Sequence, residues 1–188
     1  MELKLYTVDS NYINFLRSDK KLSNVFENKE NASPFVRKYL GTVLTIGSYK
    51  YYVPLSSSKE SDYIIDGSKK AIRKNTIPII RIVVKNKTGE SELKGTLKFS
   101  NMIPVPQNVI KYYDISKETD LNYKILVEKE YDFIKKHRNI ILKNASVLYN
   151  QKNKEALLFP AGKKKPGYLK SAVDFKYAEQ MHDKYVNL

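Results

Sequence analysis

Hydrophobic and polar residues alternate along several short stretches of the chain, which is the pattern of β-strands with one buried face. Residues 3–7 show this alternation near the start of the chain. Residues 40–53 carry β-branched and aromatic residues on both sides of Gly47 and Ser48, which predicts two strands joined by a turn. The second of these strands is expected to become a loop at Pro54.

A further group of strands is predicted in the middle of the chain. Residues 77–84 form an apolar run with a proline near its start, and residues 94–99 are the expected partner across a turn at 87–90. Residues 101–106 contain two prolines, so they are expected to form an edge strand or an extended segment leaving the sheet. Residues 109–113 are expected to pair with the sheet again.

Apolar residues at helical spacing predict helices in the rest of the chain. The first runs over about residues 9–16, and residues 18–34 then form an irregular polar loop. Residues 122–143 give the clearest helical pattern, and the apolar face of this helix is expected to pack on the sheet. Residues 146–153 and 174–185 are two more predicted helices.

The net charge is the strongest global feature of the composition. Lysine and arginine number 34 against 20 aspartates and glutamates, which leaves +14 on 188 residues, and an excess of this size attracts polyanions. Several of the 15 tyrosines stand beside a lysine, and a stackable ring next to a cation suits single-stranded RNA. The alternative is that an AT-rich genome and solubility needs produce this composition.

Two basic runs and one tyrosine are candidate RNA contacts. The run at residues 69–74 is predicted to be a phosphate-facing loop or helix end, although such runs are also common on solvated faces. The run at residues 163–165 lies in a flexible loop between glycines. The candidate residues are Lys69, Lys70, Arg73, Lys74, Lys163, Lys164, Lys165 and Tyr51.

Several classes of chemistry lose support from what the sequence lacks. There is no cysteine, and neither His137 nor His182 has a second ligand at metal spacing, so no metal or other cofactor is expected. The seven glycines stand apart and form no nucleotide-binding loop. No apolar run reaches the length of a membrane span, and no signal peptide is recognised, so we expect one cytoplasmic domain over residues 1–188.

One compact group of hydroxyls and an ammonium remains as a candidate active site. Ser56, Ser57, Ser58 and Lys59 follow the predicted hairpin, and Tyr12 is a possible companion. Cleavage of RNA by its own 2′-hydroxyl needs only proton transfer and donors that hold the phosphate oxygens, so such a group can suffice without a metal. Serine is also common in turns, and by the residues alone the run is more simply a turn.

Three stretches of the chain resemble one family. Residues 5–16, 39–59 and 95–105 are similar to the ToxN/AbiQ family, the endoribonuclease toxins of type III toxin–antitoxin systems. The resemblance implies an α+β, MazF/Kid-like fold, in which helices pack on a twisted antiparallel sheet. It also implies metal-independent RNA cleavage that leaves a 2′,3′-cyclic phosphate and a 5′-hydroxyl.

The resemblance also implies roles and partners. Ser57, Lys59, Ser56 and Tyr12 match the family's active-site positions, with serine at 56 where other members have threonine and Ser58 where some have proline. The expected partners are cellular or phage RNA and a repeated pseudoknot antitoxin RNA in a closed assembly, which serves abortive infection. The alternative functions are a basic RNA-binding module without catalysis and, less favoured because no helix-turn-helix pattern occurs, a DNA-binding regulator.

Overall fold

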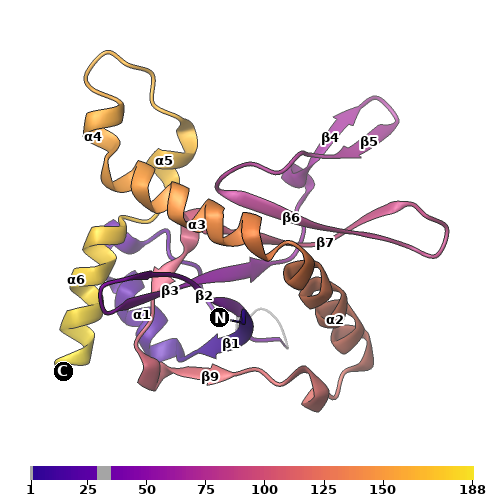
Figure 1. The fold of residues 1–188 in the computed structure, drawn as a ribbon, viewed down its shortest axis with the longest axis horizontal. Helices are drawn as coiled ribbons and strands as arrows, with labels where there is room; N and C mark the ends of the chain where they lie inside the picture. Colours follow the sequence, from indigo (N-terminus) through magenta and orange to yellow (C-terminus); the bar gives the residue numbers. More distant parts are fainter. Residues whose placement is uncertain (1, 29–34) are drawn as a thin grey trace.

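A computed structural model describes residues 2–28 and 35–188, and within them the chain has an α+β fold (Figure 1). Seven strands of this described part form one antiparallel sheet in the order β6-β7-β3-β2-β1-β9, with β8 also paired to β3. The strands are β1 (Lys4–Val8), β2 (Tyr39–Ile46), β3 (Tyr49–Ser56), β6 (Ile79–Lys85), β7 (Ser91–Lys98), β8 (Ile103–Pro104) and β9 (Ile110–Tyr112). The predicted strand pairs and the return of residues 109–113 to the sheet are confirmed.

Helices pack against this sheet. The α-helices are α1 (Ser10–Ser18), α2 (Leu121–Lys136), α3 (Arg138–Asn153), α4 (Glu155–Leu158), α5 (Gly167–Ser171) and α6 (Phe175–Val186). Short 3₁₀ turns are η1 (Lys20–Leu22), η2 (Glu60–Asp62), η3 (Phe99–Asn101), η4 (Gln107–Val109) and η5 (Ile115–Lys117). Helix α2 lies against β6 and β7, α3 against β2, and α6 against β8 and α1. The segment predicted as an irregular loop, residues 18–34, contains the turn η1. Its residues 29–34 lie outside the described part.

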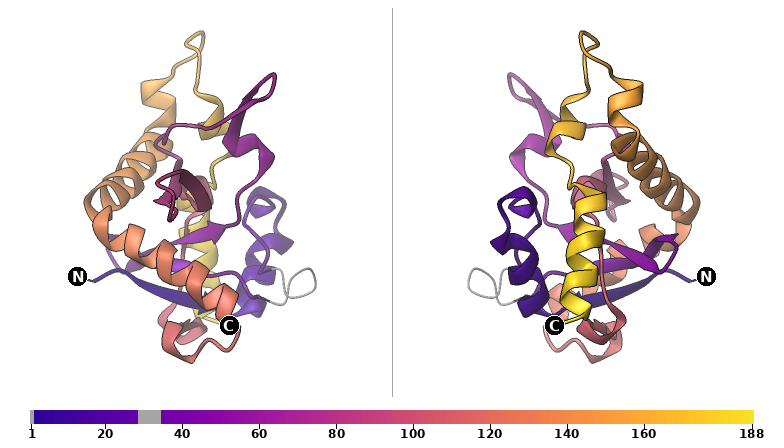
Figure 2. Two further views of the ribbon diagram at one scale, coloured as in Figure 1. Left: turned by 90° about the vertical axis from the view of Figure 1, so that its right-hand side faces the viewer. Right: turned by 90° about the vertical axis from the view of Figure 1, so that its left-hand side faces the viewer.

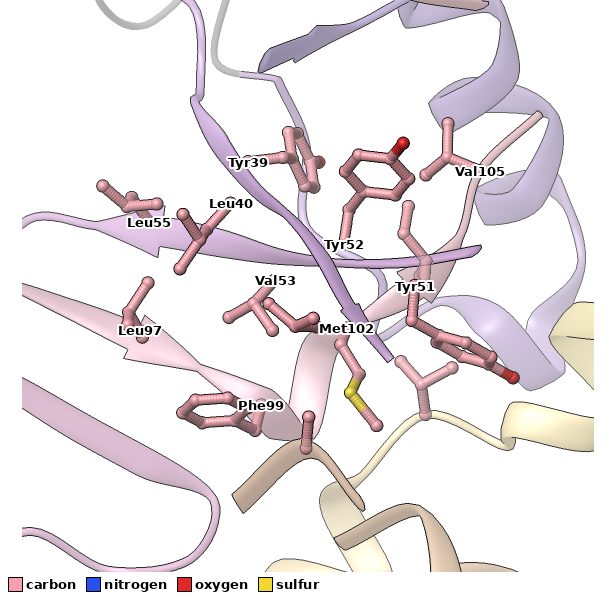
Figure 3. Packing of buried hydrophobic residues seen from close by; sticks show 14 of the residues in the cluster. Tyr39, Leu40, Tyr51, Tyr52, Val53, Leu55, Leu97, Phe99, Met102 and Val105 are labelled. Carbon is pink, nitrogen blue, oxygen red and sulfur yellow. The ribbon is translucent and has the colours of Figure 1, made fainter. Parts of the chain in front are cut away.

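Strand β3 lies at the centre of the hydrophobic core. Leu40 and Val53 pair across β2 and β3, and Leu97, Phe99 and Met102 pack close to them (Figure 3). All five side chains are almost completely buried. The core therefore fixes the position of β3, and with it the position of the residues that follow the end of this strand.

The prediction that β3 ends at Pro54 is wrong, because the strand continues to Ser56. The Leu55 amide donates to the Lys38 carbonyl on the β2 side, at 2.9 Å. Neighbouring amides in a strand point to opposite edges, so residue 54 faces the other edge. On that edge β8 pairs with residues 51–52 and β7 with residues 55–56, and proline falls between these two partners. The missing N–H therefore costs no ladder bond.

The helix predicted over residues 122–143 is two helices, which meet at His137. The His137 amide bonds to the carbonyls of Phe133 and Ile134, and its ring stacks on the Phe133 ring with centroids 3.8 Å apart. Neither glycine nor proline marks this corner, so the sequence pattern runs straight through it. The predicted apolar face is confirmed for Val127 and Ile134, which are buried.

The C-terminal helix agrees with its prediction. Asp174 accepts a hydrogen bond from the Tyr177 amide at 3.1 Å and caps α6, and Phe175, Ala178 and Met181 form its buried side. Residues 155–158 form the short helix α4, which follows the helix predicted over residues 146–153.

Two segments project from the same end of the molecule (Figure 2). One is the hairpin of β4 (Tyr63–Asp66) and β5 (Lys69–Ile72), a two-stranded sheet of its own that turns at Gly67 with φ of +57°. The other is the loop between α4 and α5. Residues 69–72 are therefore a strand, which corrects the prediction of a loop or helix end. No helix in the described part of the chain is long and apolar enough to cross a membrane.

Candidate active site

A small cleft opens where β3 ends, with a volume of about 100 Å³. Its walls come from the end of β3, the segment before β2, strand β7 and helix α2. The polar residues that line it are Arg37, Lys38, Ser56, Ser57, Lys94, Tyr123 and Glu130. Hydroxyls, cations and one carboxyl thus meet in one place.

Two of the predicted serines lie in this cleft. Ser56 pairs with Thr96 and is 7% exposed, and its carbonyl accepts a hydrogen bond from the Thr96 hydroxyl at 3.3 Å. Ser57 is the first residue beyond the strand and is exposed. The sheet therefore holds the backbone of Ser56 rigidly, while the Ser57 side chain is free to meet a ligand.

Lys59 lies close by but does not line the cleft. It is exposed, and its amide donates to the Asp62 carboxylate at 3.0 Å, while the Asp62 amide donates back to the Lys59 carbonyl. Asp62 is itself 1% exposed and forms ion pairs with Arg81 at 3.0 Å and Lys98 at 3.6 Å. Burial lowers the pKa of Lys98, the charge of Asp62 opposes this shift, and the charges of Arg81 and Lys59 reinforce it. The turn that carries Lys59 is thus attached to β6 and β7.

Two cations that the sequence analysis missed form one wall of the cleft. Arg37 donates to the carbonyls of Glu27 and Leu55, each at 2.8 Å, and Lys38 donates to the Val36 carbonyl at 2.9 Å. Burial lowers the pKa of both side chains. The signal for them was a basic pair directly before a predicted strand.

Glu130 was also missed, and it is the acidic group of the cleft. It is 7% exposed, and burial raises its pKa to about 8. Its position was visible in the pattern, because it stands three residues after Val127 and four before Ile134 on the apolar face of α2. A carboxyl at a buried helix position is a signal for function.

Tyr12 is not brought together with these residues. Its ring is completely buried, its hydroxyl donates to the Pro104 carbonyl at 2.7 Å, and Tyr185 packs edge-on against it. Pro104 pairs with Tyr51, and Ser56 lies five residues further along β3, about 16 Å at the rise of a strand. Burial raises the pKa of Tyr12. Its position favours a packing role over the predicted catalytic one.

The expectation that Tyr51 contacts RNA is corrected by its burial. The Tyr51 ring is 0% exposed, so no base can stack on it. Its hydroxyl donates to Glu179 at 2.7 Å, and Glu179 also accepts from Tyr149 and pairs with Lys176. This network joins β3 to α3 and α6.

The predicted basic contacts lie at the end of the molecule from which the two segments project (Figure 2). On the hairpin and the residues after it, Lys70 lies over the Tyr63 ring at 4.1 Å and Arg73 donates to the Tyr63 carbonyl. In the loop between α4 and α5, Lys165 is ion-paired with Glu155. The exposed members are Lys69, Lys70, Arg73, Lys74, Lys163 and Lys164.

The described residues offer no cluster of three or more histidine, cysteine, aspartate or glutamate side chains that could hold a metal ion. The groups that the cleft presents are its hydroxyls, its cations and Glu130. Cations and hydroxyls suit the oxygens of a phosphate.

Fold and cleft together define a basic α+β protein whose site suits a nucleic-acid phosphate. A family described as "Toxin ToxN, type III toxin-antitoxin system" matches residues 4–183. The chain therefore belongs to the ToxN family of type III toxin–antitoxin systems, whose curated relatives are endoribonucleases.

Individual relatives agree with this assignment. Endoribonuclease AbiQ of Lactococcus lactis subsp. lactis is 30% identical over 181 residues, which cover 95% of this chain and 87% of that protein. Endoribonuclease ToxN of Bacillus thuringiensis subsp. kurstaki is 29% identical over 149 residues, 78% of this chain and 66% of that protein. The alignment thus spans about two thirds of the length of the Bacillus relative.

Solved structures show the same fold. One, from work on toxin inhibition by a non-coding RNA pseudoknot in bacterial type III systems, has a TM-score of 0.72 and 26% identity over the whole of both chains. A second, of AbiQ, a lactococcal anti-phage endoribonuclease, has a TM-score of 0.72 and 24% identity, again over both whole chains. The antiparallel sheet with packed helices is therefore the architecture of the family.

Proposed function

We propose that this protein is an endoribonuclease toxin that cleaves RNA at the cleft beside the end of β3 and needs no metal ion. The observation that carries the proposal is the meeting of Ser57 with Arg37 and Lys38 in one small cleft. Membership of a family whose curated relatives are endoribonucleases supports the same reaction.

In the proposed reaction the RNA itself supplies the nucleophile. The 2′-oxygen forms a bond to phosphorus as it loses its proton, and the bond from phosphorus to the 5′-oxygen breaks as that oxygen gains a proton. The products are a 2′,3′-cyclic phosphate and a 5′-hydroxyl. Negative charge builds on the phosphate oxygens, and fixed donors stabilise it most when they are already in place.

The residues of the site divide this work. Ser57 donates a hydrogen bond to a phosphate oxygen from the open side of the cleft. The Ser56 hydroxyl donates to the Ser57 carbonyl at 3.4 Å, and as a second donor it exchanges that bond for one to the phosphate. Lys59, held by the turn with Asp62, reaches toward the phosphate as it binds and stabilises its charge. Arg37 and Lys38 supply further positive charge from the wall.

We also propose the regulation that the family suggests. A structural relative is described as a toxin inhibited by an RNA pseudoknot, and the exposed cations on β5 and in the loop between α4 and α5 are suitable contacts for such an RNA. A repeated pseudoknot RNA would be cut by this protein, stay bound in a closed assembly and be lost on phage infection. The fold is proposed to be MazF/Kid-like, which superposition on those toxins tests.

The test of the function is cleavage by purified protein. Wild-type protein is incubated with total RNA in EDTA, and the new ends are mapped for cyclic phosphate. Ser57→Ala and Lys59→Ala are each expected to lower the cleavage rate about a hundredfold or more, the size of effect expected of acid–base or oxyanion groups.

Ser58→Ala is the matched control, since Ser58 is an exposed hydroxyl beside Ser57 that does not line the cleft. It is expected to cleave at close to the wild-type rate. Binding of RNA by the wild type without any cleavage would replace the proposal with a non-catalytic RNA-binding module.

A further inference from the structure

Glu130 is an acidic side chain in a cleft that is otherwise basic. It projects from α2 over β7, where Gly95 leaves room for it. A Cβ atom at position 95 would overlap the Glu130 Oε1 atom, and the same point lies 3.3 Å from the Ser56 carbonyl oxygen. The carboxyl therefore rests against the backbone of β7 beside the end of β3.

Within residues 2–28 and 35–188, the Glu130 carboxyl has neither a hydrogen-bond donor nor an ion-pair partner. The cations that face it are engaged elsewhere: Arg37 and Lys38 donate to backbone carbonyls, and Lys94 of β7 pairs with Glu92. This is unusual for a buried carboxyl, which normally has its donors in place.

The other ionisable groups around α2 do not change this picture. On the same helix, Tyr123 faces the cleft and stacks on Phe35 with ring centroids 3.8 Å apart. Glu118, the residue directly after η5, accepts a hydrogen bond from Tyr113. Arg81 of β6 lies on the opposite face of the sheet, because it pairs with Thr96 whereas Gly95 pairs with Ile82.

A buried carboxyl without donors is more stable as the neutral acid, and burial raises the pKa of Glu130 to about 8. A neutral acid carries one O–H donor, whereas a carboxylate only accepts. An RNA phosphate is anionic, so it would be repelled by the carboxylate and can accept a hydrogen bond from the acid. Phosphate binding and protonation of Glu130 therefore favour each other.

Resting on the function proposed above, we propose that Glu130 is a substrate-binding residue that enters the cleft as a neutral acid and donates a hydrogen bond to a phosphate oxygen of the RNA. Its proton stays on the carboxyl throughout. The buried carboxyl then acts as a hydrogen-bond donor to a phosphate oxygen. This donor is lost when the acid ionises.

The test measures RNA binding against pH. An RNA with 2′-deoxyribose at the cleavage site cannot be cut, so its affinity for the folded protein is measured from pH 6 to pH 9. For a group with a pKa of about 8 the neutral fraction falls about tenfold between pH 7 and pH 9, and the wild-type affinity is expected to fall by a similar factor.

Three variants identify the group. Glu130→Gln keeps an uncharged donor, so it is expected to bind about as well as the wild type at pH 7 and to lose the fall above pH 8. Gly95→Ala is expected to weaken binding at pH 7 because its methyl group displaces the carboxyl. Glu128→Gln, on the exposed side of the same helix, is the control and is expected to keep the wild-type profile.

The outcomes separate this proposal from the function on which it rests. A fall above pH 8 that persists in Glu130→Gln would assign it to a cation such as Lys38 and overturn the proposal. A second result would also overturn the proposal: Glu130→Gln binds RNA normally at pH 7 but no longer cleaves ordinary RNA. Glu130 would then transfer a proton in the reaction. Failure of the wild type to cleave any RNA would contradict the proposed function and leave the binding profile interpretable.

Discussion

Two buried acids near the end of β3 have opposite surroundings. Asp62 accepts a hydrogen bond from the Lys59 amide and has two cations within 4 Å, so its negative charge is well compensated. Glu130 has no such partners among the described residues, so its surroundings favour the neutral form. One side chain therefore stabilises the fold as an anion, and the other does so only as an acid.

The pH dependence of stability should reveal the state of Glu130. Its pKa is raised from 4.5 to about 8, so the folded state holds a proton that the unfolded state releases. The stability that this proton contributes is complete below pH 4.5 and is lost as the pH rises through 8. Glu130→Gln should therefore raise the free energy of unfolding at pH 8.5 by on the order of 4 kcal/mol relative to its effect at pH 4.

Denaturant unfolding at the two pH values checks this prediction. Glu128→Gln provides the comparison for simple loss of one negative charge on α2. Equal effects of Glu130→Gln at both pH values would show that the carboxyl is ionised in the folded protein.

Gly41 is required for packing at another point of the sheet. A Cβ atom there would overlap the ring of Tyr52, which is 2% exposed and held inside the core. Gly41→Ala is expected to lower the free energy of unfolding by about 1–3 kcal/mol, the cost of an overpacked core. Gly167→Ala, whose methyl group would meet no atom within 4 Å, should change it little in the same thermal or denaturant measurement.

At the scale of elements, the short turn η2 depends on one residue for its attachment. Asp62 holds the backbone at Lys59 and binds Arg81 on β6 and Lys98 on β7. Lys59, the candidate catalytic lysine, is thus linked to the sheet through the side chain of Asp62 rather than through strand pairing.

Asp62→Ala should therefore destabilise the protein by about 3–5 kcal/mol, because it leaves Arg81 buried without its partner. RNA cleavage by the folded fraction should fall as well, because the turn that positions Lys59 loses its anchor. Asp66→Ala, at an exposed position on β4, is the control for both measurements. Unchanged stability of Asp62→Ala would show that Arg81 finds another partner.

Elements with local signals were predictable, and those decided by tertiary contacts were not. Helix α6 has an aspartate cap and a regular apolar face, and the hairpin of β2 and β3 has its glycine turn. The corner at His137 arises from packing of its ring on Phe133, and the continuation of β3 past Pro54 arises from the spacing of two partner strands. A single sequence does not carry either of these facts.

The candidate site shows the same division. Ser56 and Ser57 were recognisable as hydroxyls at a strand end, and both line the cleft. Tyr51 was chosen by residue type and Tyr12 by its match to the family's active-site positions, and neither criterion reveals burial. Glu130 was overlooked because its neighbourhood in space, between Gly95 and the end of β3, joins segments far apart in the sequence.

At the scale of the whole molecule, the exposed members of the predicted RNA-contacting set lie on and beside two projecting segments. The hairpin of β4 and β5 and the loop between α4 and α5 project from one end, whereas β9 and the C-terminus lie at the other (Figures 1 and 2). A polyanion is therefore expected to approach from the first end.

Salt dependence and charge removal test this expectation. The logarithm of RNA affinity should fall with the logarithm of salt concentration, with each phosphate contact adding about 0.7–0.9 to the slope. Replacing Lys69 and Lys70 by glutamine should reduce the slope by about one or two. Replacing Lys111 and Lys184, which are exposed at the other end, should leave the slope unchanged. Equal effects of both pairs would mean that RNA does not prefer one end of the molecule.

The different attachment of β3 and the β4–β5 hairpin has a mechanical consequence. Strand β3 is hydrogen-bonded along both edges, to β2 on one side and to β7 and β8 on the other. Among the strands of the described residues, β4 and β5 pair only with each other. Amide hydrogen exchange should accordingly be slowest in β3 and fast in the hairpin, because opening β3 requires disrupting three neighbours. The protein thus combines a rigid strand beside the candidate active site with a more flexible hairpin, which can bend to follow an RNA while the proposed site keeps its geometry.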